Sequence, residues 1–184
     1  MATRKSKKHL VWMDCEMTGL DPMKDGLLEI ATIITNYDLE IIAHGPVLPI
    51  RQSEAKLAGM DAWNRRTHKK SGLLDRVRTD GVSVAEAERL TLAFVKKYCY
   101  KRTAPLCGNS IGQDKRFLAR YMPTLHEFLH YKVVDVSSIK VLVKEWYGGK
   151  YESPEKKELH RALDDIEESI AELDYYRKHV FVKQ

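Results

Sequence analysis

The sequence predicts an α/β fold in which the first part of the sheet is antiparallel and helices pack on the sheet. Two observations support this prediction. Near the start of the chain, three strand-like runs follow one another with short turns between them, and the second run is rich in Ile, Leu and Thr. After residue 83, helical patterns alternate with short apolar runs. A meander followed by alternating helices and strands gives a mixed sheet with flanking helices.

The first three strands are expected close together in the sequence. The first is an apolar run that begins at about His9 and ends in the acids Asp14 and Glu16. The second covers residues 27–37 and ends in the turn signal Asn36-Tyr37-Asp38. The third covers residues 39–50, where two prolines favour an edge strand or a bulge. Short turns between successive strands predict antiparallel pairing.

The second part of the chain alternates between helices and strands. Ser83 and Glu86 form a capping box at the start of a helix, and Thr124 and Glu127 form a second one after Pro123. Besides the helix that the second capping box opens, helices are expected at residues 83–100, 112–121, 137–147 and 160–179, a buried strand at 104–109 and a short strand at 131–136. Gly148-Gly149 ends the helix at 137–147.

Composition indicates a cytoplasmic, soluble protein with one domain. The chain has 184 residues, of which 43% are apolar and 31% charged. The sequence has no apolar stretch of membrane-spanning length, and the basic residues 1–8 lack the apolar segment of a signal peptide. The cysteines Cys15, Cys99 and Cys107 fit neither a disulfide framework nor a zinc spacing. We expect them to be small buried side chains in a reducing compartment.

The charge of the chain favours a polyanionic partner. The formal net charge is +5 and the isoelectric point about 9.0. The excess is modest and lies partly in the N-terminal tail, so composition alone supports nucleic acid only weakly. A basic surface around a group of acids is more informative, because it would bring a polyanion to a metal site.

Asp14 and Glu16 are the first candidates for that metal site. Alternate side chains of a strand share one face, so the two carboxylates are expected to point the same way. Mg²⁺ and Mn²⁺ prefer such oxygen ligands. The alternative is a strand end whose acids are simply solvated, and this pair alone does not decide between the two.

Two further groups of polar residues lie where helices are expected to begin. Asp114 would lie in the first turn of helix 112–121, where its alternative role is to stabilise the helix dipole. Asp164 and Asp165 lie near the start of the last helix, with His160 just before them. A separation of five residues would not place His160 and Asp165 on one helix face. We therefore expect His160 on a loop that bends back toward Asp165.

Together, these groups resemble a known superfamily. Asp14-x-Glu16, Asn109-Ser110-Ile111-Gly112-x-Asp114 and His160-x-Ala162-x-x-Asp165 are similar, in order, to the three exonuclease motifs of the DEDDh superfamily. The fuller strings WMDCEMTGLDP, GNSIGQDKRFL and HRALDDIEESI resemble the oligoribonuclease family, and the similarity runs from about residue 9 to 179. The resemblance implies a ribonuclease-H-like fold, with residues 9–184 as a single exonuclease domain after the tail 1–8.

The resemblance also implies an activity and a cofactor. Members of this family degrade very short RNA from its 3′ end to nucleoside 5′-monophosphates. Asp14, Glu16, Asp114 and Asp165 would hold two divalent cations, Mg²⁺ or Mn²⁺. His160 would be the general base, and an imidazole suits that role because it titrates near the working pH. Asp164 does not match the motif.

The resemblance further implies how short single-stranded RNA is held. Leu20 and Trp63 would pack against two bases, although a tryptophan is more often part of a core. The phosphates and sugar would be surrounded by His68, Ser110, Gln113, Tyr131, Lys132 and Ser137. His68 could equally be a surface residue beside Lys69-Lys70. Tyr131 and Ser137 also have structural alternatives, at a strand start and as a helix cap.

Two expectations concern Tyr131 and its neighbour. The family is homodimeric, and Tyr131 would reach the site of the partner. Family members usually carry Arg after this tyrosine, whereas this chain has Lys132. Lysine keeps the positive charge but lacks the two-pronged donor geometry of arginine, so we expect a weaker preference for a terminal 5′-phosphate.

Two other functions are compatible with the sequence. One is a related exonuclease that trims longer RNA or single-stranded DNA, which would need a long basic groove with several aromatic platforms. The dense basic runs are confined to the N-terminal tail and residues 65–70, which favours short substrates. The other is a non-catalytic nucleic-acid-binding module. The intact acids and His160 argue against it.

Overall fold

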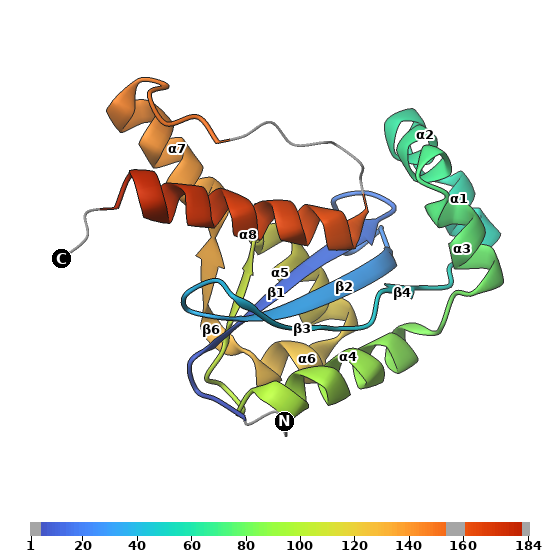
Figure 1. Cartoon of the computed structure of the whole chain (residues 1–184). Coiled ribbons are helices and arrows are strands. Elements are labelled where there is room, and N and C mark those ends of the chain that lie inside the picture. The colour runs from blue at the N-terminus through green and yellow to red at the C-terminus, as the bar shows by residue number, and fades with distance from the viewer. Residues whose placement is uncertain (1–4, 154–160, 182–184) are drawn as a thin grey trace.

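The computed structural model describes residues 5–153 and 161–181, and a six-stranded sheet lies at the centre of this part of the chain (Figure 1). The strands are β1 (His9–Met17), β2 (Leu27–Asn36), β3 (Ile41–His44), β4 (Leu48–Pro49), β5 (Pro105–Gly108) and β6 (His130–Asp135). The helices are α1 (Glu54–Ala58), α2 (Ala62–Lys70), α3 (Leu73–Thr79), α4 (Val84–Tyr98), α5 (Gly112–Tyr121), α6 (Pro123–Phe128), α7 (Val136–Tyr147) and α8 (Ala162–His179).

The sheet is mixed, as predicted. Its order is β3-β2-β1-β5-β6, and β4 pairs with β2. The β1–β2 and β2–β3 pairs are antiparallel, whereas β1–β5 and β5–β6 are parallel. The C-terminal ends of β1, β5 and β6 therefore lie at one edge, a common place for binding sites in α/β folds. The region expected as one strand, residues 39–50, forms two short strands instead, and Pro46, which has no N–H to donate, lies in the break between them.

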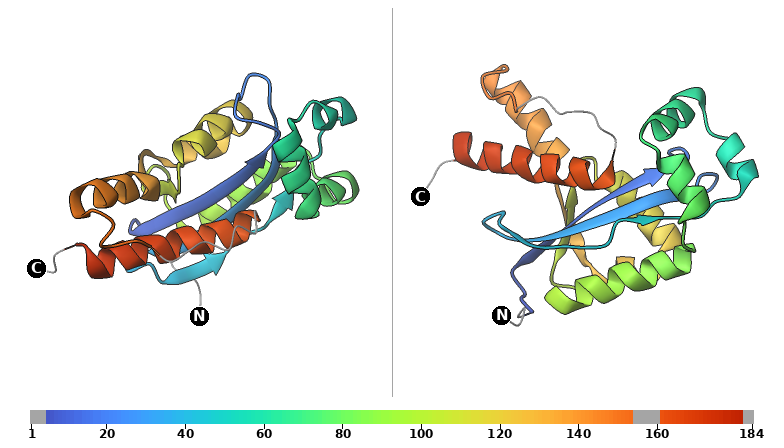
Figure 2. Two further views of the ribbon diagram at one scale, coloured as in Figure 1. Left: turned by 90° about the horizontal axis from the view of Figure 1, so that it is seen from above. Right: turned by 45° about the vertical axis from the view of Figure 1, so that its right-hand side comes forward.

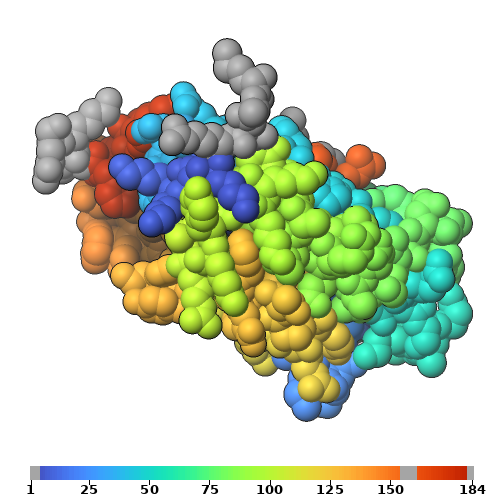
Figure 3. Space-filling model, turned by 90° about the horizontal axis from the view of Figure 1, so that it is seen from below, coloured from blue at the N-terminus to red at the C-terminus, as the bar shows by residue number. Residues whose placement is uncertain are grey.

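Alternate residues of β1 belong to two different core clusters. Val11, Met13 and Cys15 pack with side chains of α4, α5 and α6. Leu10 and Trp12 pack with side chains of α7 and α8 on the opposite face. Figure 2 shows α8 on one side of the sheet and α5 on the other, and Figure 3 shows α4 beside α6 on the underside. Each large side chain buried in this way stabilises the fold by about 1.5–3 kcal/mol.

The capping predictions are confirmed in part at one helix and wrong at another. Ser83 caps α4, because its side chain accepts a hydrogen bond from the backbone of Glu86. The Glu86 carboxylate bonds to Arg89 instead of completing the predicted box. Helix α6 starts at Pro123 after Met122, which makes no side-chain cap, so Thr124 lies inside the first turn and forms no capping box. Proline at the first helical position accounts for this start, because its fixed φ suits that position and it has no N–H to satisfy.

Helices α1, α2 and α3 were not predicted from the sequence. They form a helical group beside the sheet (Figures 1 and 2). Ser53 and Asp61 cap α1 and α2 through their side chains. These two caps were the available signal, but the helices are short and mostly polar, so no hydrophobic period accompanied them. A small cluster joins the group to β2 through Leu28, Leu57, Met60, Leu73, Leu74 and Val77.

Two further expectations concern the cysteines and the membrane. Cys15, Cys99 and Cys107 are all buried and unpaired, as predicted. None of the helices in the described part of the chain is long and apolar enough to cross a membrane.

Candidate active site

Three carboxylates converge where β1 meets the start of α8. Asp14 and Glu16 continue the face of β1 that carries Leu10 and Trp12, so they point toward α8 as the strand period predicts. Asp165 comes from the first turn of α8, which Ala162 and Ile166 pack against the same face. One carboxylate oxygen of each acid lies within 4.8 Å of those of the other two. This spacing allows all three to bind one small cation.

Asp114 lies beside this group rather than within it. It occupies the first turn of α5 and is buried. Its Oδ1 accepts a hydrogen bond from the backbone N–H of Cys15 at 2.9 Å, so the residue between Asp14 and Glu16 is tied to α5.

Burial and mutual repulsion strongly raise the pKa values of these acids. Burial raises the pKa of Asp14 well above its usual value, and the charges of Asp114 and Glu16 raise it further. Burial, with the charges of Asp165 and Glu29, raises the pKa of Glu16 to about 8. Burial raises the pKa of Asp114 to about 7, although the hydrogen bond from Cys15 opposes the shift. Such a cluster holds excess negative charge that a divalent cation would neutralise.

A fifth acid, which sequence reasoning missed, lies beside Glu16. Glu29 is opposite Glu16 in the β1–β2 register, and its side chain is only 1% exposed. Arg76 on α3 forms an ion pair with it, with 2.6 Å between Nη1 and Oε1. A glutamate inside an otherwise apolar strand was the signal that could have marked this position. The ion pair anchors the α1–α3 group next to the acids.

His68 is part of the interior and not a surface residue beside Lys69-Lys70. Its side chain is 2% exposed. Nε2 lies 3.0 Å from the carbonyl oxygen of Met17 and must donate, because a carbonyl only accepts. Nδ1 lies 3.8 Å from Oε2 of Glu16. His68 therefore holds the end of β1 through Met17 and places its ring beside Glu16, and a direct contact with substrate stays a prediction.

The loop that carries Leu20 is held in place by α5. The Leu20 side chain is 71% exposed, whereas its carbonyl oxygen accepts a 2.5 Å hydrogen bond from Nε2 of Gln113. Tyr121 donates to the carbonyl oxygen of Asp25 on the same loop. Gln113 thus has a defined structural role, which sequence reasoning did not assign to it. A fixed backbone with an exposed apolar side chain suits a surface that receives a base.

Trp63 belongs to the surface and not to the core. Its side chain is 53% exposed and lies in the first turn of α2, which Asp61 caps. The loop between β1 and β2, helix α2 and the N-terminal end of α8 gather at one end of the sheet (Figures 1 and 2). The structure therefore places Leu20 and Trp63 on segments that flank the acids.

Ser110 and Ser137 meet at the ends of β5 and β6. The N–H of Ser110 lies 3.0 Å from both Oγ of Ser137 and Oδ1 of Asp135. Asp135, and not Ser137, caps α7, because its carboxylate accepts from the N–H of Ser137. Ser110 has a left-handed backbone, with φ of 50°. That conformation costs a residue other than glycine about 1–2 kcal/mol, so these hydrogen bonds have to hold it.

Tyr131 and Lys132 lie toward the other end of β6. The register pairs Gly108 with Asp135 at the C-terminal edge and Pro105 with His130 at the N-terminal edge. Tyr131 is next to His130 and 74% exposed, and Lys132 is exposed as well. The structure thus brings Ser110, Ser137 and the acids to one edge but leaves Tyr131 well away from it. His160 lies outside the described residues, and its role remains a prediction.

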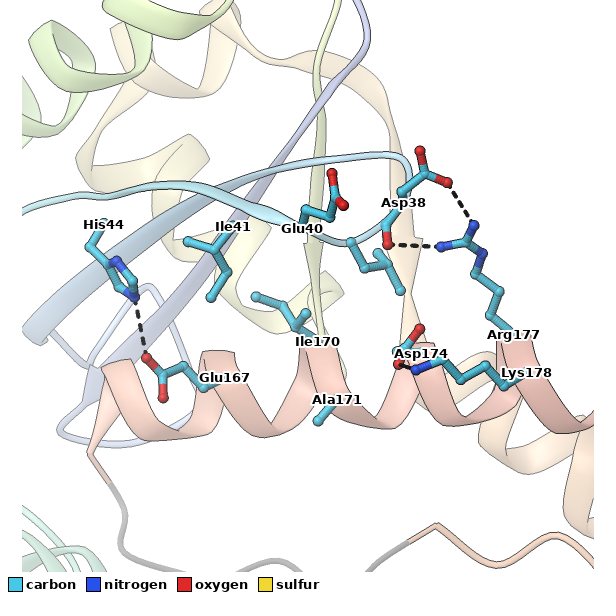
Figure 4. Close-up of a pocket in the computed structure, with 11 residues that line it drawn as sticks. Asp38, Glu40, Ile41, His44, Glu167, Ile170, Ala171, Asp174, Arg177 and Lys178 are labelled. Carbon is cyan, nitrogen blue, oxygen red and sulfur yellow. Dashed lines mark hydrogen bonds and ion pairs between the residues drawn. The ribbon is translucent and has the colours of Figure 1, made fainter. Parts of the chain in front are cut away.

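A cavity of about 570 Å³ lies between β3 and α8, away from these groups (Figure 4). His44 faces Glu167 across it at 3.3 Å, and Arg177 bonds to Asp38. Its lining includes neither the converging acids nor Ser110. This cavity is therefore not the candidate active site.

Comparison with known proteins identifies the class of protein to which this sheet and this site belong. The model of the RNase T exonuclease family matches residues 11–173, so the chain belongs to the exonucleases. It is 55% identical over 178 residues to the oligoribonuclease of Paracidovorax citrulli, covering 97% of this chain and 92% of that one. It is 53% identical over 179 residues to the oligoribonuclease of Pseudomonas aeruginosa strain PAO1, covering 97% and 99%. The chain belongs to the oligoribonuclease family.

Solved structures support the fold. A zinc-bound E. coli ExoI–ssDNA complex aligns with a TM-score of 0.73 at 14% identity. Exonuclease I of Methylocaldum szegediense aligns with a TM-score of 0.69 at 16% identity. The alignments cover 96% and 94% of this chain but 41% of each exonuclease, so this chain corresponds to less than half of their length. The likeness confirms the predicted ribonuclease-H-like fold.

These findings establish the coarse function. The family relationships support a 3′–5′ exoribonuclease, a hydrolase of phosphodiester bonds. The family and the cluster of Asp14, Glu16 and Asp165 together indicate that the enzyme uses divalent metal.

Proposed function

We propose that this enzyme hydrolyses very short single-stranded RNA, down to dinucleotides, from the 3′ end to nucleoside 5′-monophosphates. The observation that carries the proposal is a compact site: three converging acids flanked by two segments that carry the exposed side chains Leu20 and Trp63. Met23, on the same loop as Leu20, is exposed as well. The proposal assigns the two bases to Leu20 and Trp63. A long groove with further aromatic platforms is not needed for such a substrate.

The four motif acids would hold two divalent cations, Mg²⁺ or Mn²⁺. The donor set fits, because these hard cations prefer carboxylate oxygens, and the pKa values of Asp14, Glu16 and Asp114 are raised first by burial and further by neighbouring acids. Bound metal would supply charge stabilisation for the attacking and leaving oxygens at phosphorus. The protein itself positions the acids through the hydrogen bond from Cys15 to Asp114 and through the packing of α8 on β1.

His160 would accept a proton from the attacking water. The motif places it five residues before Asp165, and α8 is described from Ala162 onward. An imidazole is the side chain whose ordinary pKa best suits proton transfer near neutral pH.

Leu20 and Trp63 would each contact one base. The hydrogen bonds from Gln113 and Tyr121 fix the Leu20 loop, and the Arg76–Glu29 ion pair anchors the helices that carry Trp63. Since both supports exist without substrate, little ordering would be required on binding. Ser110 and Ser137 would contact a phosphate or sugar at the edge of the sheet.

The enzyme would act as a homodimer. Tyr131 lies at the N-terminal end of β6, so it cannot easily serve the acids of its own protomer at the opposite edge. The edge strand β6 and helix α7 also expose Val133, Val141, Leu142 and Trp146. Burying these apolar side chains against a second copy would place Tyr131 near the partner. Ultracentrifugation of wild-type protein and a Trp146→Glu variant tests this arrangement, and a monomeric wild type contradicts it.

End-labelled RNA from two to twenty nucleotides tests the function directly. The ladder is incubated with Mg²⁺, with Mn²⁺ or with chelator, and the products are resolved by length. We expect metal-dependent cleavage that is fastest for dinucleotides. Preferential trimming of the longest RNA, or of matched single-stranded DNA, would identify the longer-substrate exonuclease, and binding without hydrolysis would identify a non-catalytic module.

A further inference from the structure

Asn109 belongs to the second exonuclease motif, but it is neither one of the four acids nor a proposed contact of the RNA. It follows Gly108 at the end of β5, which runs parallel to β1. A Cβ atom on Gly108 would lie 2.9 Å from Cδ1 of Ile111 and 3.1 Å from the carbonyl oxygen of Met13. The end of β5 therefore packs closely against the backbone of β1, next to Asp14.

The amide nitrogen of Asn109 faces α8. Nδ2 donates to Oγ of Ser169 at 2.8 Å and to Oε2 of Glu172 at 3.1 Å, which uses both of its hydrogens. Its Oδ1 accepts from the hydroxyl of Ser137 at 3.0 Å. Ser169 and Glu172 are 4% and 3% exposed and lie one and about two turns after Asp165 on the helix. The amide therefore holds the part of α8 that follows this acid.

Ser169 extends the contact to the backbone of Asp165. Its Oγ donates to the carbonyl oxygen of Asp165 at 2.7 Å while it accepts from Asn109. The carboxylate of Asp165 lies on the side of Asp14 and Glu16. Asn109 and Ser169 thus connect the strand beside β1 to the helical turn from which the third converging acid projects.

Glu172 keeps the amide in this orientation. A charged carboxylate only accepts hydrogen bonds, so the nitrogen of Asn109, and not its oxygen, has to face it. Oε1 of Glu172 accepts from the hydroxyls of Ser153 at 3.2 Å and Tyr176 at 3.3 Å, and Nζ of Lys140 lies 3.4 Å away. Burying a charge is costly unless it is paired and hydrogen-bonded. Glu172 has such partners of its own, so it does not depend on the metal site.

We propose that Asn109 is a positioning residue which, through Ser169, fixes the start of α8 on the end of β5 and so sets the separation of the Asp165 carboxylate from those of Asp14 and Glu16. The proposal rests on the proposed function, because it takes these three acids as metal ligands. Small cations bind oxygen at nearly fixed distances, about 2.0–2.1 Å for Mg²⁺. Three carboxylates from two elements can therefore share a cation only if the elements are held at a defined separation.

The first test measures Mn²⁺ binding by calorimetry without RNA. Asn109→Ala and Ser169→Ala each interrupt the connection, and we expect the Kd for Mn²⁺ to rise by about 10–100-fold, as for other partners that orient metal ligands. Thr35→Val is the control. Thr35 is fully buried, accepts from Nε1 of Trp12 at 2.9 Å and pairs with Leu10, toward the other end of β1 from the acids. All three variants should lower the melting temperature, but Thr35→Val should keep the wild-type Mn²⁺ affinity.

Kinetics and a double variant distinguish positioning from loss of stability. At a Mn²⁺ concentration that just saturates the wild type, Asn109→Ala should lower kcat for a dinucleotide with little change in KM, and more Mn²⁺ should restore most of the rate. Asn109→Ala combined with Ser169→Ala should bind Mn²⁺ little worse than either single variant, because both interrupt one connection. Wild-type Mn²⁺ affinity in both single variants, or losses that add in the double variant, would overturn the proposal.

Failure of this proposal can be told apart from failure of the proposed function. A wild-type enzyme that binds Mn²⁺ but cleaves no dinucleotide would contradict the proposed function, and the Mn²⁺ affinities of the variants would still decide the role of Asn109. A wild type that binds no Mn²⁺ would overturn both. If Asn109→Ala does not fold, Ser169→Ala allows the same comparison, because it removes a single hydroxyl.

Discussion

The acids of the site and the side chains proposed to hold the bases differ in how much they are exposed. Asp14, Glu16 and Asp165 are partly buried between β1 and α8 and have little room to move. Leu20 and Trp63 are 71% and 53% exposed on segments at the periphery. Both groups are nevertheless held by interactions behind them, namely buried packing for the acids and backbone hydrogen bonds or caps for the platforms.

Because of this difference, substitutions in the two groups should have different effects on the stability of the fold, on activity and on substrate binding. Crowded carboxylates favour their protonated forms, so without metal their charges lower the stability of the folded protein. An exposed Leu or Trp costs the fold little, because it leaves no cavity when truncated. Substitutions among the acids should therefore abolish activity without harming the fold. Substitutions of the platforms should weaken binding by amounts that stacking alone can explain.

The largest effect is expected at the acids. Asp165→Asn should abolish cleavage while circular dichroism remains unchanged, because one member of the converging group loses its charge. Asp164→Asn is the matched control, since Asp164 lies next to it but does not match the motif, and it should retain activity. Full cleavage by Asp165→Asn, or by the wild type in excess chelator, would contradict a metal site at these residues.

His160 comes next. His160→Ala should lower kcat by about 10²–10⁴-fold, the usual range for a positioned general base, with little change in KM. His44→Ala provides the control, because His44 belongs to the separate cavity beside α8 (Figure 4). A variant that turns over bound RNA normally but binds it poorly would make His160 a binding residue.

The acids of the site were more predictable from the sequence than the segments that carry Leu20 and Trp63. The period of β1 placed Asp14 and Glu16 on one face, and the start of α8 fell near Asp165, because local spacing alone determines both. Asp114 was expected in a first helical turn and is found there. The bond from Asp114 to the backbone of Cys15 could not be predicted, because it joins residues 99 positions apart.

The helices and contacts that hold Trp63 next to the acids were missed for a related reason. Helices α1–α3 have short, polar sequences, and their position depends on a small cluster and on the Glu29–Arg76 pair. The two lysines that follow His68 in the sequence are typical of a surface position, yet the His68 side chain faces Met17 and Glu16. Only tertiary packing decides which side of a short polar helix is buried.

The proposed stacking of a base on Trp63 can be tested by substitution. Trp63→Ala should weaken dinucleotide binding by about 1–3 kcal/mol, the range for stacking of one base, with little change in melting temperature. Trp63→Phe keeps an aromatic face and should retain most of the affinity. Tyr37→Ala, at an exposed turn on the β2–β3 side, is the control. A large fall in melting temperature for Trp63→Ala would place its main role in the fold.

Lys132 tests selectivity for the phosphate end. Lys132→Ala should weaken binding of a 5′-phosphorylated dinucleotide by about 1.5–3 kcal/mol, as for hydrogen bonds to charged groups. It should also narrow the kcat/KM gap between two- and seven-nucleotide RNA. Lys132→Arg restores a two-pronged donor and should widen the gap. An unchanged ratio in both variants would rule out a phosphate contact at this position.

The smallest effect concerns the stability of the metal-free protein. Glu16 has a pKa of about 8 and Asp114 of about 7 in the folded protein, against 4.5 and 3.8 ordinarily. Between pH 4 and 8 the folded state thus binds more protons than the unfolded state, so the free energy of unfolding falls as pH rises. With chelator present, we expect a lower melting temperature at pH 8 than at pH 6, by about 2–4 °C for each kcal/mol lost. Mg²⁺ or Mn²⁺ should reduce the difference, and Glu16→Gln should reduce it in chelator because it removes one of the groups whose pKa is raised. A metal-free wild type that is more stable at pH 8, or a Glu16→Gln variant with the same slope, would show that these acids are not crowded in solution.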